Sequence, residues 1–204
     1  MAMIWDVVVG VVILVVLVAA GAIGGVLLAR HRLASNVGDN PDEVRIGAWT
    51  TNTLAGSSAA NALTRARIAI HGILALHRRE TIYFFASQDD HGNPLTSEHD
   101  WEIEGRGFDC RWWSFTLYDE DYQLIESLSR RYSVHSDNVV AEPDGSYRIV
   151  ISRGNPDTNW LASGNAKRLM VTIRLYNPSP AVLDDVTGVA LPSIRRIEKG
   201  RAAA

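Results

Sequence analysis

The segment RWWSFTLY, residues 111–118, carries the strongest strand pattern in the chain, because aromatic and β-branched residues dominate it. The acidic cluster at residues 119–121 is expected to end the strand. Successive side chains of a strand point to opposite faces of a sheet, so Trp112 and Trp113 are expected to face opposite ways. One of them can then be part of a core while the other is available to a ligand or partner.

Further strand patterns follow on both sides of this segment. Residues 169–176 alternate Leu, Val, Ile and Leu with Met, Thr, Arg and Tyr, and Pro178 and Pro180 are expected to stop this strand. Clusters of turn-forming residues at 89–94 and 143–145 separate other candidates. Many short strands of this kind predict a mainly β fold, a β-sandwich or jelly-roll-like domain. The remaining expected strands are residues 81–87, 101–104, 122–125, 131–135 and 147–152.

One amphipathic helix is expected before these strands. Ser57 or Ser58 is a suitable N-cap, and the basic residues 77–79 suit a helix C-terminus. Apolar residues recur between them at helical spacing, which predicts one buried stripe. That stripe consists of Leu63, Ala66, Ile70 and Leu74.

An uncharged apolar run occupies residues 7–29. At about 1.5 Å per residue, such a helix is roughly 34 Å long and can cross the hydrocarbon core of a bilayer. A cleaved signal peptide is the alternative, since Ala20-Gly21-Ala22 has the small-x-small form of a cleavage site. No Lys or Arg precedes the run, however, and apolar residues continue beyond that site, which favours an uncleaved anchor bound to the lipid bilayer through residues 7–29.

The sequence therefore divides into four segments: an anchor at residues 1–32, a linker at 33–45, a β-rich domain at 46–197 and a tail at 198–204.

The charges of the sequence do not determine which side of the membrane the domain occupies. Arg30 and Arg32 favour a cytoplasmic domain under the positive-inside rule. The single cysteine, Cys110, gives no information about the redox compartment.

The composition argues against several classes of function. With a formal net charge of -3 and 21% charged residues, the chain offers no electrostatic basis for binding nucleic acid. It contains no phosphate loop, no dinucleotide fingerprint and no nucleophile elbow, so no cofactor is expected.

Three groups of residues could bind a metal ion or take part in a reaction, and each also has a simpler structural explanation. His91, Glu98, His99 and Asp100 are potential metal ligands, but they lack a recognised ligand spacing. The acidic residues 119–121 suit Ca²⁺ or a carboxylate pair, and equally a solvated turn. Cys110 is either a reactive thiol or a buried, inert cysteine. We therefore expect no metal and assign no catalytic residue.

Several motifs occur in an order that resembles one bacterial family. They are RWWSFTLYD (111–119), RYS (131–133), NWL (159–161) and RLY (174–176), with GAWT (47–50) and TRAR (64–67) upstream. This series resembles the domain-of-unknown-function family 1214 over residues 45–197. The resemblance implies an exported, periplasmic domain on the bacterial inner membrane. It also implies a partner, because the family 1254 domain that often precedes this one is missing here, and a separate chain would supply it.

These motifs hold the candidate contact residues for a ligand or partner. Aromatic faces flanked by guanidinium groups suit a sugar or a lipid headgroup, although core packing explains aromatics equally well. The expected function is a membrane-anchored envelope protein that binds a partner protein or an envelope component. The alternative is a hydrolase or lyase on an envelope carbohydrate or lipid, with Asp119, Asp121 or His135 as acid or base. The candidates are Trp112, Trp113, Tyr118, Tyr132, Trp160, Arg174 and Tyr176.

Overall fold

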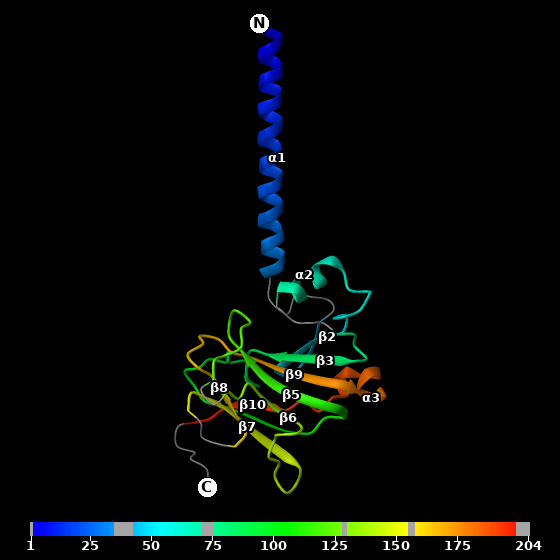
Figure 1. Ribbon diagram of the computed structural model, residues 1–204, viewed down its shortest axis with the longest axis vertical. Coiled ribbons are helices and arrows are strands. Elements are labelled where there is room, and N and C mark those ends of the chain that lie inside the picture. Colours follow the sequence, from blue (N-terminus) through cyan, green and yellow to red (C-terminus); the bar gives the residue numbers. More distant parts are fainter. Residues whose placement is uncertain (1, 35–42, 71–75, 128–129, 155–157, 199–204) are drawn as a thin grey trace. The chain divides into compact units, whose positions relative to one another are not determined.

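The computed structural model describes residues 2–34, 43–70, 76–127, 130–154 and 158–198. Contacts divide the chain into two units, residues 1–39 and 40–204. The first unit contains one helix, α1 (Ala2–Ala34), shown in dark blue in Figure 1. Within it, Trp5–His31 is long and apolar enough to cross a membrane, a property that signal sequences share. An N-terminal apolar helix is thus confirmed.

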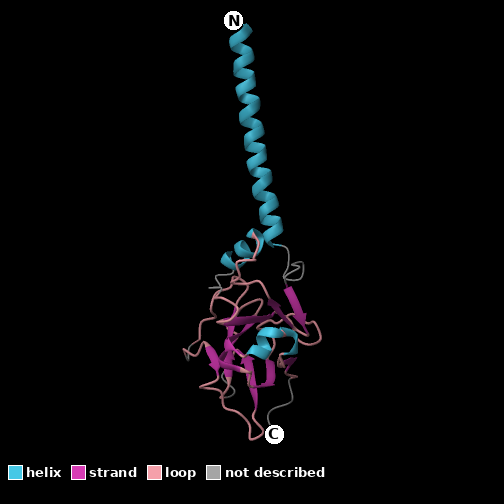
Figure 2. Cartoon of the chain, turned by 90° about the vertical axis from the view of Figure 1, so that its right-hand side faces the viewer, coloured by secondary structure: helices cyan, strands magenta, loops and turns pink. Residues whose placement is uncertain are grey.

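Strands dominate the second unit (Figure 2). Its described residues form two sheets, one of six strands in the order β1-β2-β3-β9-β5-β6 and one of four in the order β10-β4-β7-β8. The mainly β prediction is confirmed. The bounds are β1 Glu43–Ile46, β2 Trp49–Asn52, β3 Thr81–Ala86, β4 Trp101–Arg106, β5 Cys110–Tyr118, β6 Ser133–His135, β7 Ser146–Ser152, β8 Trp160–Ala162, β9 Met170–Pro178 and β10 Ser193–Arg196.

The core lies between the inner faces of these two sheets. Phe115 and Ile173 from the six-stranded sheet and Ile103 and Ile149 from the four-stranded sheet are fully buried in a single cluster. Trp113 belongs to this cluster, whereas Trp112 does not. Neighbouring residues of β5 therefore face opposite ways, as the sequence predicts.

Two strand predictions need correction. Residues 122–125 form no strand: they follow the turn at residues 120–121, and Leu124 makes a single bridge with Tyr118. Tyr122 has a φ of 60°, and the Asp119 carboxylate accepts the backbone N–H of Gln123. β9 ends at Pro178 itself, two residues beyond the expected end at Tyr176, and Pro180 begins α3.

The boundary of the expected linker also changes. β1 includes Glu43, so the linker prediction is wrong for residues 43–45. These residues pair with β2 across a short hairpin in which Gly47 has a φ of 60°. Strands β2, β8 and β10 were not expected either. The structure adds a helix α3 (Pro180–Asp184), capped by Ser179, and a 3₁₀ turn η1 (Val186–Gly188).

The amphipathic helix is shorter than expected. Helix α2 spans Ala62–Ile70, and Asn61 caps it instead of Ser57 or Ser58, because the Asn61 side chain accepts the N–H of Thr64 at 2.9 Å. The basic residues 77–79 lie in a turn before β3. The predicted apolar stripe remains a prediction, since the side chains of Leu63 and Ile70, and the whole of Leu74, lie outside the described residues.

Candidate ligand-binding face

The outer face of the six-stranded sheet, on the side away from the core, brings polar and aromatic side chains into register. His135, Ser114, Arg174 and Tyr83 are Cα partners in one row across β6, β5, β9 and β3. In the adjacent row, Trp112 pairs with Tyr176. We call the following set the aromatic–arginine face: Tyr83, Trp112, Thr116, Tyr118, His135, Arg174 and Tyr176.

Arg174 is the cation of this face. Its guanidinium donates to the Thr116 hydroxyl at 2.9 Å and to the Tyr118 hydroxyl at 2.6 Å. The same group lies 5.6 Å from the centroid of the Tyr118 ring. Arg174 is partly buried, and both of its hydrogen-bond partners are neutral.

Trp112 forms the other end of the face, together with two neighbouring rings. Its ring centroid lies 5.3 Å from that of Tyr176 and 5.1 Å from that of His135. The indole Nε1 donates to the Asp137 carboxylate at 2.6 Å. The backbone N–H of Asp137 donates to His135 Nδ1 at 3.3 Å. The same nitrogen lies 3.7 Å from the Asp137 carboxylate.

The structure thus brings four of the sequence candidates onto one face: Trp112, Tyr118, Arg174 and Tyr176. The other three lie elsewhere. Trp113 is in the core, 5.2 Å from the Tyr147 ring. Tyr132 is 41% exposed in the loop before β6. Trp160 is 6% exposed on the four-stranded sheet, where its Nε1 donates to the Ser152 hydroxyl at 3.0 Å.

Sequence reasoning missed two residues of this face and one beside it. Tyr83 is buried, stacks on Phe85 at 6.4 Å, and has its pKa raised by burial. Its position in an aromatic, β-branched strand pattern, residues 81–87, was a usable signal. Thr116 and Asp137 had no comparable signal, because their roles depend on which strands pair.

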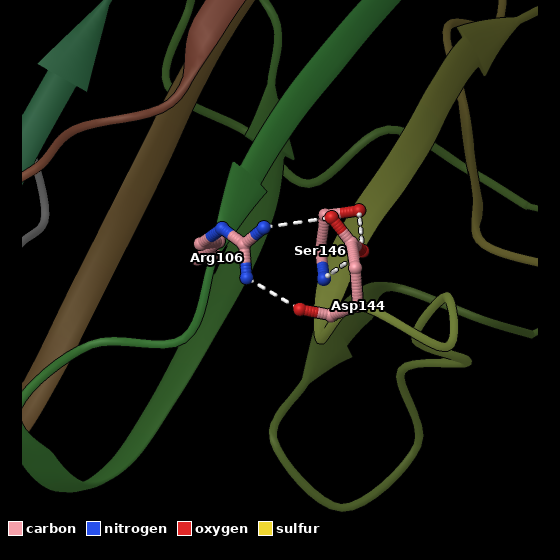
Figure 3. Close-up of polar contacts among 3 residues, drawn as sticks. All are labelled: Arg106, Asp144 and Ser146. Atoms are coloured by element: carbon pink, nitrogen blue, oxygen red, sulfur yellow. Dashed lines mark hydrogen bonds and ion pairs between the residues drawn. The ribbon is translucent and has the colours of Figure 1, made fainter.

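The outer face of the four-stranded sheet has a different character, since its charges balance each other. Arg148 pairs with Glu102 at 3.0 Å, and Arg195 pairs with Glu104. Beside them Arg106 contacts Asp144 at 2.7 Å (Figure 3). Ser146 and Arg106 hold the pKa of Asp144 below its usual value.

The residues considered as metal ligands have structural partners nearby. The carboxylate of Asp89 is buried and accepts the N–H groups of His91 and Asn93. Burial alone would raise the pKa of Asp89, but these hydrogen bonds and the Asn93 side chain lower it below the usual value. His99 packs against Trp101 at 6.0 Å. Among the residues that the structure describes, no three His, Cys, Asp or Glu residues are grouped closely enough to hold a metal ion.

The acidic residues 119 and 120 form hydrogen bonds with backbone N–H groups, and Cys110 is partly buried. Asp119 accepts the N–H groups of Asp121 and Gln123, at 2.9 and 2.8 Å. Glu120 accepts the N–H of Lys167 at 3.1 Å, and backbone hydrogen bonds lower its pKa. Burial raises the pKa of Cys110 to about 11, so its sulfur stays a thiol at neutral pH.

Two solved structures resemble this fold. The VPA0106 protein from Vibrio parahaemolyticus aligns with a TM-score of 0.57 and 23% identity, over 69% of this chain and 36% of its own. A putative uncharacterized protein from Burkholderia cenocepacia aligns with a TM-score of 0.47 and 17% identity. The alignment covers 87% of this chain and 41% of the Burkholderia chain. This chain therefore spans little more than a third of the Vibrio chain, and at this identity the likeness shows the fold alone.

No curated protein matches the sequence. A family match covers the strands that build the aromatic–arginine face. Residues 80–180, from the start of β3 to the start of α3, match the family described as "Protein of unknown function (DUF1214)". Over residues 80–180 the chain is therefore similar to DUF1214 proteins, which supports the family resemblance seen in its motifs.

Proposed function

We propose that this chain is a DUF1214 protein that acts as a membrane-anchored binding module of the bacterial cell envelope. Its recognition surface is the aromatic–arginine face. The contrast between the two outer sheet faces is the observation that carries the proposal. One face pairs its arginines with carboxylates, whereas the other presents rings, hydroxyls and a guanidinium that has neutral hydrogen-bond partners. Such a surface suits a sugar, a headgroup or a partner side chain.

The proposed location is the inner membrane, with α1 as a single-pass anchor and the β unit in the periplasm. The apolar run at residues 7–29 supports the anchor. The resemblance to exported proteins supports the periplasmic side, against the bias of Arg30 and Arg32. An anchored module keeps a high local concentration near other membrane components, which strengthens otherwise weak contacts.

A separate chain with a family 1254 domain is the proposed protein partner. Support comes from the resemblance, because a family 1254 domain often precedes the family 1214 domain. The hydrolase or lyase alternative has weaker support. The Asp119 carboxylate already accepts two backbone N–H groups of its own turn, and Asp121 lies in the same turn.

Photo-crosslinking in intact membranes tests this proposal. Replacing Tyr176 with p-benzoylphenylalanine puts a crosslinker on the aromatic–arginine face while keeping an aromatic side chain. The same replacement at Arg195 on the four-stranded sheet is the matched control. We expect a discrete adduct from position 176 and none from position 195. Equal adducts from both positions, or none from position 176, would refute the proposed surface.

A further inference from the structure

We infer that Arg174 holds the oxyanion, a carboxylate or a phosphate, of a sugar bound on the aromatic–arginine face. This inference rests on the proposed function and specifies its ligand. It starts from the charge of one residue. The contacts of Arg174 within the described part of the chain are the Thr116 and Tyr118 hydroxyls and the Tyr118 ring, and no ion pair joins it to a carboxylate there.

A guanidinium in this position has unused binding capacity. Arg carries five N–H donors, and the two printed hydrogen bonds go to neutral oxygens. Charges withdrawn from water are normally paired, because removing their hydration is costly. Hydrogen bonds between an arginine and a carboxylate or phosphate are also about twice as strong as neutral ones. An incoming oxyanion would therefore gain more at Arg174 than at an arginine that already has a carboxylate partner.

The other sheet provides the internal comparison. Arg106, Arg148 and Arg195 each have a carboxylate partner from the same chain. All three are paired although at least 40% of each side chain is exposed to water. Arg174, on the six-stranded sheet, is partly buried and donates to neutral hydroxyls, and Arg78, in the turn before β3, likewise donates to a neutral group, the Leu183 carbonyl. Unlike the three paired arginines of the other sheet, Arg174 donates to hydroxyls and has no carboxylate partner among the described residues, which leaves it able to take a counter-charge from a ligand.

The surroundings of Arg174 favour a sugar over a bare ion. Tyr176, two residues further along β9, and its cross-strand partner Trp112 supply aromatic surface for a sugar ring. An anionic sugar would place its oxyanion at Arg174 and its ring towards Tyr176.

Three sugars with one ring and different C6 groups test this inference. The full chain in a polyoxyethylene detergent, which contains neither sugar nor phosphate, is titrated by calorimetry with glucose, glucuronate and glucose 6-phosphate. We expect glucuronate or glucose 6-phosphate to bind at least about tenfold more tightly than glucose. The tighter of the two identifies the oxyanion as carboxylate or phosphate. The preference should shrink in high salt, since the contact is electrostatic.

Two variants connect that preference to one residue. Arg174→Met should reduce the charged sugar to the affinity of glucose, whereas Arg148→Met, on the other sheet, should leave the preference unchanged. Equal affinity for all three sugars, or an unchanged preference in a folded Arg174→Met protein, would overturn the inference. If Arg174→Met does not fold, the wild-type protein tests the inference. A preference for a charged sugar that shrinks in high salt supports it, and a preference that salt does not change overturns it. A crosslink at Tyr176 together with equal affinity for charged and uncharged sugars would support the proposed function. It would rule out only the inference that Arg174 binds an oxyanion.

Discussion

At the level of single residues, Thr116 and Thr172 are a natural matched pair. They are cross-strand partners on β5 and β9, and both are buried on the outer side of the sheet. The Thr116 hydroxyl accepts from Arg174 at 2.9 Å. The Thr172 hydroxyl has no hydrogen-bond partner among the described residues. The same substitution at the two positions should therefore have opposite effects.

Valine has nearly the shape of threonine but lacks the hydroxyl. Thr172→Val removes an unpaired buried group, so we expect the free energy of unfolding to stay the same or rise by up to about 1 kcal/mol. Thr116→Val removes an acceptor from a charged donor and should lower it by about 1–3 kcal/mol. Urea denaturation of the full chain, followed by tryptophan fluorescence, measures both. Equal losses in the two variants would show that the Thr172 hydroxyl has a partner after all.

The residues of the site show where sequence reasoning ends. The opposite orientations of Trp112 and Trp113 follow from the pleat of a single strand, so they were predictable. The contacts of Arg174 depend on the register between β9 and β5, which are far apart in sequence. Trp160 lies in a motif of the same family resemblance, yet the structure places it on the other sheet. Membership in a motif thus does not predict membership in a site.

At the level of elements, the packing of β4 against the segment before β10 depends on a residue without a side chain. A Cβ on Gly105 would lie 2.7 Å from Cβ of Pro192 and 3.0 Å from the Tyr147 hydroxyl. Gly105→Ala should therefore destabilise the protein by about 1–3 kcal/mol. Gly107→Ala is the control, since a Cβ there would lie 3.8 Å from its nearest neighbour, Trp113 Nε1.

We expect the control to be neutral or slightly stabilising, because alanine restricts the unfolded chain more than glycine does. The melting temperatures of the two variants, followed by near-ultraviolet circular dichroism, give the comparison. A Gly105→Ala protein that melts with the wild type would mean that β4 and the Pro192 segment separate easily.

Strand length explains most of which elements were predictable; β6, with three residues, was expected only as part of the longer pattern at residues 131–135. β5, β7 and β9 are seven to nine residues long, so their alternation or aromatic content is clear in the sequence. β2, β8 and β10 have three or four residues, which is too short for a period of two to stand out. Residues 122–125 show the converse error. Their apolar content resembles a strand, but the Asp119 carboxylate holds the preceding turn, and this local hydrogen bonding prevails.

At the level of the whole molecule, the two units differ in what stabilises them. The second unit, residues 40–204, has its own core between two sheets. α1 is apolar on every side, because no charged residue occurs from position 7 to 29. A helix of this kind is stable in lipid rather than in water. The β unit should therefore fold without α1, while α1 should hold the full chain in a membrane.

Deleting residues 1–32 tests both statements. We expect the shortened chain to be soluble, monodisperse and rich in β structure by circular dichroism. The full chain should sediment with membranes and resist extraction at alkaline pH, as an integral protein does. Mass spectrometry of the full chain from membranes adds the decisive control, because signal-peptide cleavage after Ala22 would leave a mature chain that begins at Ile23. A mature chain of that kind, released without detergent, would show that α1 is a signal peptide and that the β unit works in solution.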